Sequence, residues 1–318
     1  MRRLLWNAAE GRLRGPWRLA IFIGLVGLLA NPPVLLLDAT GIALLERSLV
    51  NPIVALAFLA ALAICARWVD RRPLSDFGLS SSRTWWVEIG VGLVAGAAGP
   101  SVALGLAYLA GWVRLEEIAW TSLAAPFAAV LLGQVARYLG GAFFEELFSR
   151  GYLLRLVAEA MRTRLGGRRA VVGAWLLTAA VFGVLHAWNP GVTVLSAWNL
   201  TVIGAAYGVG MILTGRLAIP IGFHAGWNLF QNCVFGLPNS GQPPVATLMV
   251  TRLDGPEIWT GGAFGIEGGL LGLLACAVGV AVVLAWLRLR PGGLTLATSL
   301  AEPPVGQSRS SSSTSMAR

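Results

Sequence analysis

The sequence contains no lysine, and charged residues of every kind are scarce. Only 12% of its 318 residues are charged, whereas a soluble domain typically has about 25%. Because 56% of the residues are hydrophobic and the mean hydropathy is +0.71, too few polar side chains remain to cover a surface in water. The composition therefore excludes an ordinary soluble domain and predicts an all-α, polytopic transmembrane helical bundle.

Cysteine and histidine are also rare. The three cysteines, Cys65, Cys233 and Cys276, lie in apolar stretches and form no C-x-x-C pair. This spacing argues against a disulfide framework and against a cysteine zinc site, so we interpret the three thiols as small buried hydrophobic groups. Any imidazole chemistry must use the only two histidines, His186 and His224.

All 24 basic residues are arginine, and the net charge is +9. A basic chain could bind nucleic acid, but these arginines cluster between the apolar runs, as the positive-inside rule expects for cytoplasmic loops. We therefore predict no nucleic-acid partner. We expect an integral membrane protein of a prokaryotic cell membrane, with both termini cytoplasmic.

Apolar runs of roughly 20 residues predict about eight spans. Residues 1–290 are expected to form a single transmembrane domain, and residues 291–318 a disordered, Ser/Pro-rich cytoplasmic tail. The expected spans are Pro16–Leu37, Asn51–Val69, Trp85–Trp112, a fourth between Thr121 and Met161, Ala170–Trp188, Val194–Leu213, Leu217–Phe235 and Phe264–Leu287.

Three short polar motifs interrupt these apolar segments, within about residues 122–235. Ionisable groups cost roughly 2.5–3.5 kcal/mol each to insert into a bilayer, so they persist mainly where function requires them. The motifs are Glu145-Glu146 with Arg150, Phe182 with His186, and His224 with Asn228.

Helical spacing assigns a possible task to each motif. Glu146 and Arg150 are four residues apart and can pair, whereas Glu145 points about 100° away and can accept a proton from water. His224 and Asn228 share a helix face and could donate two hydrogen bonds to an oxyanion. They could instead bind a metal, although Asn is a poor zinc ligand. Taken singly, each motif could also be a salt bridge, a core histidine or a polar helix contact.

A common site requires these groups at one depth in the membrane. If the fourth helix ended at Arg150, His186 would lie roughly 24 Å from Glu145 at 1.5 Å per residue. A helix from about Arg137 to Arg162 removes this mismatch. We therefore predict a long fourth helix, kinked near Gly151, with a buried Arg150.

The three motifs, in this order, resemble the CPBP family, the CAAX-prenyl protease and bacteriocin-processing (Abi-type) group of intramembrane endopeptidases. That family's pattern is E-E-x-x-x-R, then F-x-x-x-H, then H-x-x-x-N or H-x-x-x-D, and every position matches here. The segment Arg72-Pro-Leu-Ser-Asp-Phe-Gly-Leu79 also resembles a stretch found upstream in bacterial members. The resemblance covers roughly residues 70 to 235.

The resemblance implies hydrolysis of a peptide bond in a membrane-embedded or membrane-associated protein or peptide. Carried over by position, Glu145 and His186 activate water, and His224 and Asn228 stabilise the oxyanion. Glu146 and Arg150 support the site. The family has been described both as zinc metalloproteases and as metal-free glutamate proteases. Either no cofactor or zinc is thus possible, and a zinc ion would be held by Glu145, His186 and His224.

Two other functions remain open from the sequence. A catalytically silent member of the same family could act as an immunity factor or bind a membrane partner. A proton-coupled transporter could also use intramembrane Glu and His, although the chain lacks the paired inverted repeats typical of transporters.

Overall fold

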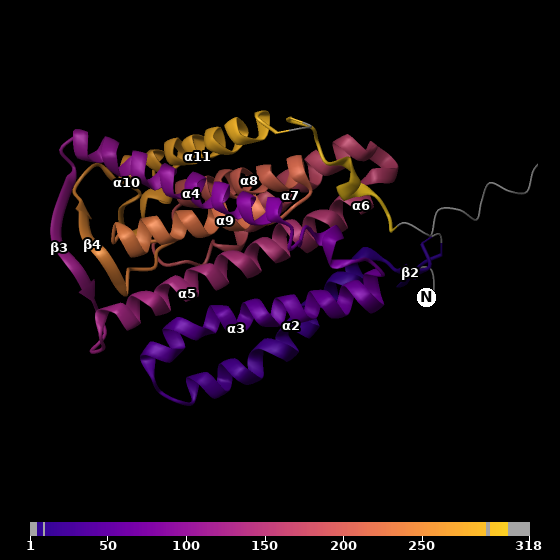
Figure 1. Ribbon diagram of the computed structural model, residues 1–318, viewed down its shortest axis with the longest axis horizontal. Coiled ribbons are helices and arrows are strands. Elements are labelled where there is room, and N and C mark those ends of the chain that lie inside the picture. Colours follow the sequence, from indigo (N-terminus) through magenta and orange to yellow (C-terminus); the bar gives the residue numbers. More distant parts are fainter. Residues whose placement is uncertain (1–4, 9, 291–292, 305–318) are drawn as a thin grey trace, which may run out of the picture.

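A computed structural model describes residues 5–8, 10–290 and 293–304 (Figure 1). The predicted all-α membrane bundle is confirmed: within these ranges, seven helices are long and apolar enough to cross a membrane. They are α2 (Gly15–Asp38), α3 with the π-helix η1 (Ala43–Asp70), α4 (Arg83–Leu109), the run α5–η3–α6 (Phe127–Leu165), α7 (Gly167–Leu185), α8 (Val194–Thr214) and α11 (Leu270–Arg288).

The seventh predicted span differs from these helices. It forms α9 (Ala218–Asn228), which continues into the π-helix η4 (Leu229–Val234), and it is shorter than the other spans. Every residue from Ala218 to Trp227 is buried. Neighbouring helices therefore enclose α9, and the polar side chains that it carries lie inside the protein.

The predicted long fourth helix is present and exceeds its expected limits. It comprises α5 (Phe127–Glu146), the π-helix η3 (Leu147–Leu153) and α6 (Leu154–Leu165), without a break. The π-helix lies around Gly151, where the sequence predicted a kink, and Arg150 is buried as expected. π-helical segments shift the register of the residues that follow them, so η3 sets the face on which α6 continues.

Close backbone contact between α4 and α9 fixes the position of the enclosed helix. Gly92 and Gly96 of α4 face Gly222 and Gly226 of α9. A Cβ atom at Gly96 would lie 2.1 Å from the carbonyl oxygen of Phe223. Both helices thus carry a G-x-x-x-G pattern, which permits close packing in membranes.

Two spans begin at different residues from those predicted. The second begins at Ala43 rather than Asn51. The eighth begins at Leu270 rather than Phe264, because the preceding residues form α10 (Glu257–Thr260) and the short 3-10 helices η5 (Gly262–Phe264) and η6 (Ile266–Gly268). Gly261, Gly262 and Gly265 have positive φ in this segment, a conformation that a regular helix cannot accommodate.

Two strands outside the bundle were not predicted. β3 (Val113–Thr121) pairs antiparallel with β4 (Ala246–Leu253), so that Val113 lies opposite Leu253 and Thr121 opposite Ala246. Figure 1 shows this ribbon at the end of the bundle away from α6. The strands join segments more than 100 residues apart, and the sequence suggested only connecting loops there.

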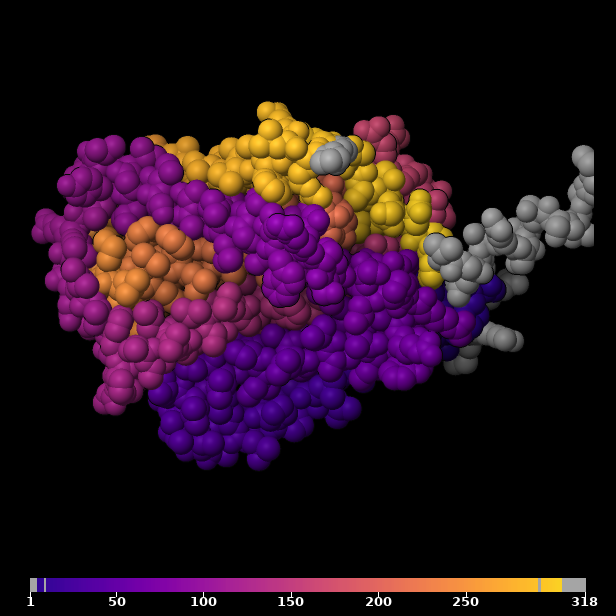
Figure 2. Space-filling view, in the orientation of Figure 1, coloured from indigo at the N-terminus to yellow at the C-terminus, as the bar shows by residue number. Residues whose placement is uncertain are grey.

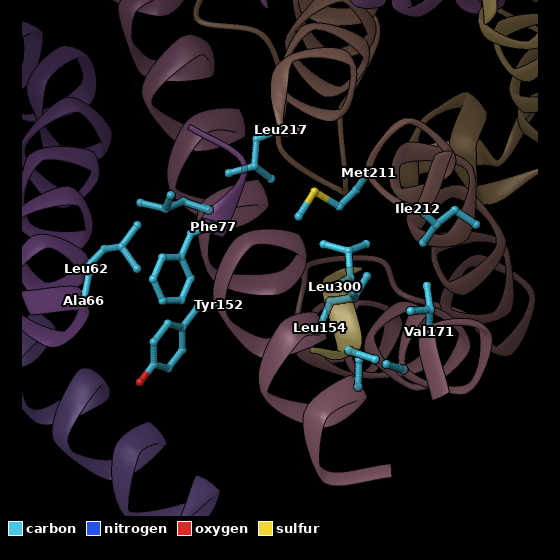
Figure 3. Close-up of a cluster of buried hydrophobic side chains, with 14 of the residues drawn as sticks. Leu62, Ala66, Phe77, Tyr152, Leu154, Val171, Met211, Ile212, Leu217 and Leu300 are labelled. Atoms are coloured by element: carbon cyan, nitrogen blue, oxygen red, sulfur yellow. The ribbon is translucent and has the colours of Figure 1, made fainter. Parts of the chain in front are cut away.

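A hydrophobic cluster ties the opposite end together (Figure 3). Phe77 of the 3-10 helix η2 (Leu74–Phe77), Tyr152 and Leu217 belong to it, as does Leu300 of η7 (Thr298–Ala301). Leu300 has 0% exposure. The prediction of a disordered tail is therefore wrong for residues 298–301, because Leu300 packs into this core. Residues 291–292 and 305–318 lie outside the described part of the chain.

Buried ion pairs hold the N-terminal segment at the same end. β1 (Trp6–Asn7) and β2 (Arg12–Leu13) form a small hairpin before α2. Arg12, Arg18 and Arg72 all contact the carboxylate of Glu159 on α6, at 2.7, 3.1 and 2.6 Å respectively. The pairing connects α2 and the segment after η1 to the fourth helix. In the space-filling view, the α2–α3 hairpin lies along α5 and forms one side of the molecule (Figure 2).

Candidate active site

A cavity of about 530 Å³ lies between α3, α5, α7, α8 and α9. Four of the six predicted site residues line it: Glu145, His186, His224 and Asn228. The other two, Glu146 and Arg150, are fully buried behind this surface. The three motifs, which come from three helices, therefore converge on one cavity.

The Glu145 carboxylate lies close to both histidine side chains. Its Oε2 atom lies 3.9 Å from His186 Nε2 and 3.9 Å from His224 Nε2. This oxygen is buried and accepts no hydrogen bond within the protein. A gap of 3.9 Å is too long for a direct hydrogen bond but short enough for one water molecule to contact both atoms.

His186 is oriented by the end of its own helix. It follows the last residue of α7, and its Nδ1 lies 2.7 Å from the carbonyl oxygen of Phe182. A carbonyl can only accept, so Nδ1 carries the proton and donates. The Nε2 atom of the neutral ring therefore presents a lone pair toward Glu145. Two contacts thus explain the spacing Phe182-x-x-x-His186: the hydrogen bond from His186 Nδ1 to the Phe182 carbonyl oxygen, and the packing of the two rings, whose centroids are 4.5 Å apart.

Glu146 joins the first motif to the third. Its Oε1 accepts hydrogen bonds from Arg150 Nη1 and from His224 Nδ1, both at 2.9 Å. The predicted Glu146–Arg150 pair is therefore present, and it also fixes His224 with Nε2 toward Glu145. Arg150 further donates to the Gly204 carbonyl oxygen at 2.5 Å and lies 4.6 Å from the centre of the Phe182 ring.

Asn228 follows His224 by one helical turn and lines the same cavity. Its Oδ1 accepts a hydrogen bond from Asn239 Nδ2 at 3.0 Å. Because its oxygen is occupied, the amide N–H groups of Asn228 are available to a bound molecule. Asn239 therefore orients Asn228 in the way that Glu146 orients His224.

The lining residues that escaped the sequence reasoning include Tyr207, Asn239 and Glu267. The Tyr207 ring stacks on His224 with centroids 4.7 Å apart. A tyrosine followed by Gly208 in a mostly apolar span was the available signal for Tyr207. Asn239 and Glu267 lie in irregular segments, where no helical spacing connects them to the motifs.

Glu267 joins two irregular segments beside the cavity. Its carboxylate accepts hydrogen bonds from Gln231 and from the backbone N–H of Ser240, and the Ser240 hydroxyl donates to it at 3.1 Å. Burial raises the pKa of the Glu267 carboxyl to about 7, although these hydrogen bonds oppose the shift. The group can therefore change its charge near neutral pH.

The predicted zinc ligands have the right chemistry but not the spacing of a metal site. A tetrahedral zinc ion with bonds of about 2.0–2.1 Å would bring Glu145 Oε2 closer to each histidine Nε2 atom than the 3.9 Å observed. Among the described residues, no group of three or more His, Cys, Asp or Glu side chains is arranged to hold a metal ion. We therefore derive no catalytic step through a metal.

Comparison with known proteins identifies the same region. A family model described as "Rce1-like: Type II CAAX prenyl endopeptidase Rce1-like" matches residues 125–230. The matched segment runs from the start of α5 to η4 and contains all three motifs. No curated protein and no solved structure gives a significant match.

Proposed function

We propose that the chain cleaves a membrane-associated protein or peptide in the cavity around Glu145. The match of residues 125–230 to the Rce1-like family of type II CAAX prenyl endopeptidases, which are intramembrane proteases, supports this proposal. The observation that carries this proposal is the position of Glu145 Oε2, 3.9 Å from the Nε2 atoms of two histidines. Carboxylate and imidazole groups within reach of one water molecule can act as general bases.

The attacking water is held by two acceptors. Its hydrogens point to Glu145 Oε2 and to the Nε2 lone pair of His186, so an oxygen lone pair is directed at the substrate carbonyl. As the water oxygen bonds to the carbonyl carbon, Glu145 takes one of the water protons. It delivers this proton to the amide nitrogen when the C–N bond breaks, and an amine and a carboxylic acid, which keeps the second water proton, are released.

The developing oxyanion is stabilised by His224 and Asn228. His224 donates from Nε2 as an imidazolium, and the Glu146 carboxylate, which accepts a hydrogen bond from Nδ1, holds the ring in that orientation. Asn228 donates from its amide nitrogen, which the hydrogen bond from Asn239 leaves free. Removing one such donor typically lowers kcat by 10²–10³-fold. Glu146 and Arg150 act as positioning residues, since they do not line the cavity.

The arrangement of arginines supports the predicted orientation. Arginines 155, 162, 164, 168 and 169 lie in or beside α6, at the end of the bundle opposite β3 and β4 (Figure 1). By the positive-inside rule we propose that this end faces the cytoplasm and that residues 1–290 form one transmembrane domain.

The test uses the wild-type chain in lipid nanodiscs with a fluorescent peptide that carries a farnesylated cysteine followed by three apolar residues. We expect cleavage by the wild type and a loss of at least about 10²-fold in Glu145→Gln, because the proton acceptor is removed. Glu117→Gln serves as the control, since Glu117 lies on β3, outside the cavity. A comparison of membrane-peptide profiles in cells that express each variant extends the assay to native substrates. Equal profiles for wild type and Glu145→Gln would instead indicate a silent binding protein.

A further inference from the structure

A buried carboxylate beside the cavity has no task in the proposed hydrolysis. Glu267 of η6 is 2% exposed and lines the cavity, but it lies beyond residues 125–230, which the family model matches. Among the described residues, its partners are the neutral donors Gln231 and Ser240 rather than an arginine. A buried carboxylate without a counter-charge is costly, so its position in the cavity wall indicates a function.

One partner of Glu267 belongs to a tight turn that forms part of the cavity wall. Asn239 and Gln242 exchange two backbone hydrogen bonds of 2.9 Å, and both residues line the cavity. The two residues between them, Ser240 and Gly241, have positive φ angles of 49° and 78°, which is the pattern of a type I′ turn. Glycine adopts this conformation freely, whereas serine does so only at a cost that the surrounding structure must offset. The turn therefore needs support at Ser240.

The segment that carries Glu267 supplies this support. The Glu267 carboxylate accepts hydrogen bonds from the backbone N–H and from the hydroxyl of Ser240, the second at 3.1 Å. Gly241 N–H donates to the carbonyl oxygen of Phe264 in η5 at 2.8 Å, and Asn189 Nδ2 donates to the carbonyl oxygen of Ser240 at 3.1 Å. Because hydrogen bonds to an ionised acceptor are stronger than neutral ones, Glu267 is the main support of the strained residue.

The same turn orients Asn228. Asn239, which precedes Ser240, donates from Nδ2 to Asn228 Oδ1 at 3.0 Å. Without this donor the amide of Asn228 would be free to rotate, and its oxygen would repel an oxyanion instead of stabilising it. A shift of the turn at Ser240 therefore reaches the oxyanion site through one neighbouring residue.

A second contact of Glu267 reaches the helix that carries Asn228. The carboxylate accepts a hydrogen bond from Gln231 Nε2, and Gln231 Oε1 accepts one from Trp227 Nε1 at 2.7 Å. Because an indole N–H only donates and a carboxylate only accepts, these partners fix both ends of the Gln231 amide. Trp227 precedes Asn228, and Gln231 follows it by three residues. Glu267 thus holds the helix and the turn on either side of the hydrogen bond between Asn228 and Asn239.

We propose that Glu267 is a positioning residue, which holds the turn from residue 239 to 242 so that Asn239 keeps the amide N–H groups of Asn228 directed at the oxyanion. The inference rests on the proposed function and deepens it. Because negative charge develops on the carbonyl oxygen only as the reaction proceeds, a misplaced donor weakens transition-state binding more than substrate binding. Loss of Glu267 should therefore lower kcat and leave KM nearly unchanged.

Steady-state cleavage of the farnesylated peptide in nanodiscs tests this role. We expect Glu267→Ala and Asn239→Ala each to lower kcat by about 10–100-fold and to change KM by less than about threefold. The isosteric Glu267→Gln keeps one acceptor for Ser240, so its kcat should lie between those of Glu267→Ala and wild type, and it carries the test if Glu267→Ala does not fold. Glu257→Ala is the matched control and should equal wild type, because Glu257 is exposed on α10 in the same irregular segment and outside the cavity.

Removal of Asn228 separates positioning from general stability. In an Asn228→Ala background no amide remains to be oriented, so adding Glu267→Ala should lower kcat by less than about a further threefold. Hydrogen exchange gives a second readout that needs no cleavage. Glu267→Ala should speed exchange of the backbone N–H groups of Ser240 and Gly241 much more than exchange along α5.

Each result decides a separate point. A wild-type kcat in Glu267→Ala, or losses that are fully additive with Asn228→Ala, would overturn the positioning role and leave the protease intact. A raised KM at unchanged kcat would also overturn it, because Glu267 would then act in substrate binding. Equal acceleration of exchange in the turn and in α5 would show a general support of the fold and overturn it as well. If the wild type cleaves nothing while the turn still loosens in Glu267→Ala, the protease is overturned together with the positioning role, and only the support of the turn stands.

Discussion

Glu145 and Glu146 are neighbours in the sequence, but we expect their replacement by glutamine to affect stability very differently. Glu146 has 0% exposure and accepts hydrogen bonds from both Arg150 and His224. Glu145 Oε2 accepts none within the protein. Glu146→Gln removes the counter-charge of a buried guanidinium, whereas Glu145→Gln removes no stabilising contact made by that oxygen.

The expected magnitude follows from the burial of the pair. Arg150 is 1% exposed, and its remaining partners are the neutral oxygens of Ser149 and Gly204. Breaking a buried ion pair by removal of one member typically costs about 3–5 kcal/mol, because the other charge stays buried. Glutamine keeps one acceptor, so we expect a loss of about 3 kcal/mol for Glu146→Gln and less than about 0.5 kcal/mol for Glu145→Gln.

Reversible unfolding of the purified protein in mixed micelles, together with peptide cleavage, would measure both effects. Both variants should lose activity, and only Glu146→Gln should lose stability. In the double variant Glu146→Gln/Arg150→Met the buried cation is absent, and stability should recover relative to Glu146→Gln alone. Equal stabilities of the two single variants, or no recovery in the double variant, would refute the assignment of Glu146 as the buried partner.

Three further predictions concern packing, pH and metal. Gly96→Ala should cost about 1–3 kcal/mol of stability and lower cleavage, because its Cβ would press on α9 beside His224. Gly105→Ala, with nothing within 4 Å of its Cβ, should do neither. The raised pKa of Glu267, about 7, means that the folded protein binds a proton more tightly than the unfolded chain. Stability should therefore fall by up to about 3 kcal/mol as the pH rises from about 4.5 to 7, and Glu267→Gln should flatten this dependence in thermal unfolding curves. Cleavage should survive dialysis against EDTA, and elemental analysis should find far less than one zinc per chain. Stoichiometric zinc whose removal abolishes activity would contradict the glutamate mechanism.

Local patterns in the sequence were sufficient for the spans and for the pairing of Glu146 with Arg150. Helical periodicity alone places residues four apart on one face, so that ion pair required no knowledge of other helices. The long fourth helix was also predictable, because a common depth for Glu145 and His186 excluded a helix that ends at Arg150. The match of the family model to residues 125–230 agrees with the same three motifs.

The partners of the motif residues were not predictable. Asn239 orients Asn228 from a loop, and Tyr207 stacks on His224 from another helix. No spacing rule connects these residues to the motifs. The β3–β4 ribbon could not be predicted either, because its strands pair across more than 100 residues.

The amino-acid sequence by itself determined that this chain crosses a membrane and which few polar side chains each span carries, because hydropathy and helical period act over short distances. Only the tertiary structure decided that Glu145 lies between two Nε2 atoms, and that Glu146, which pairs with Arg150, also holds His224. Those contacts depend on how closely α4 and α9 approach at their glycines and on the register of the π-helix. Both are properties of packed helices rather than of any single one.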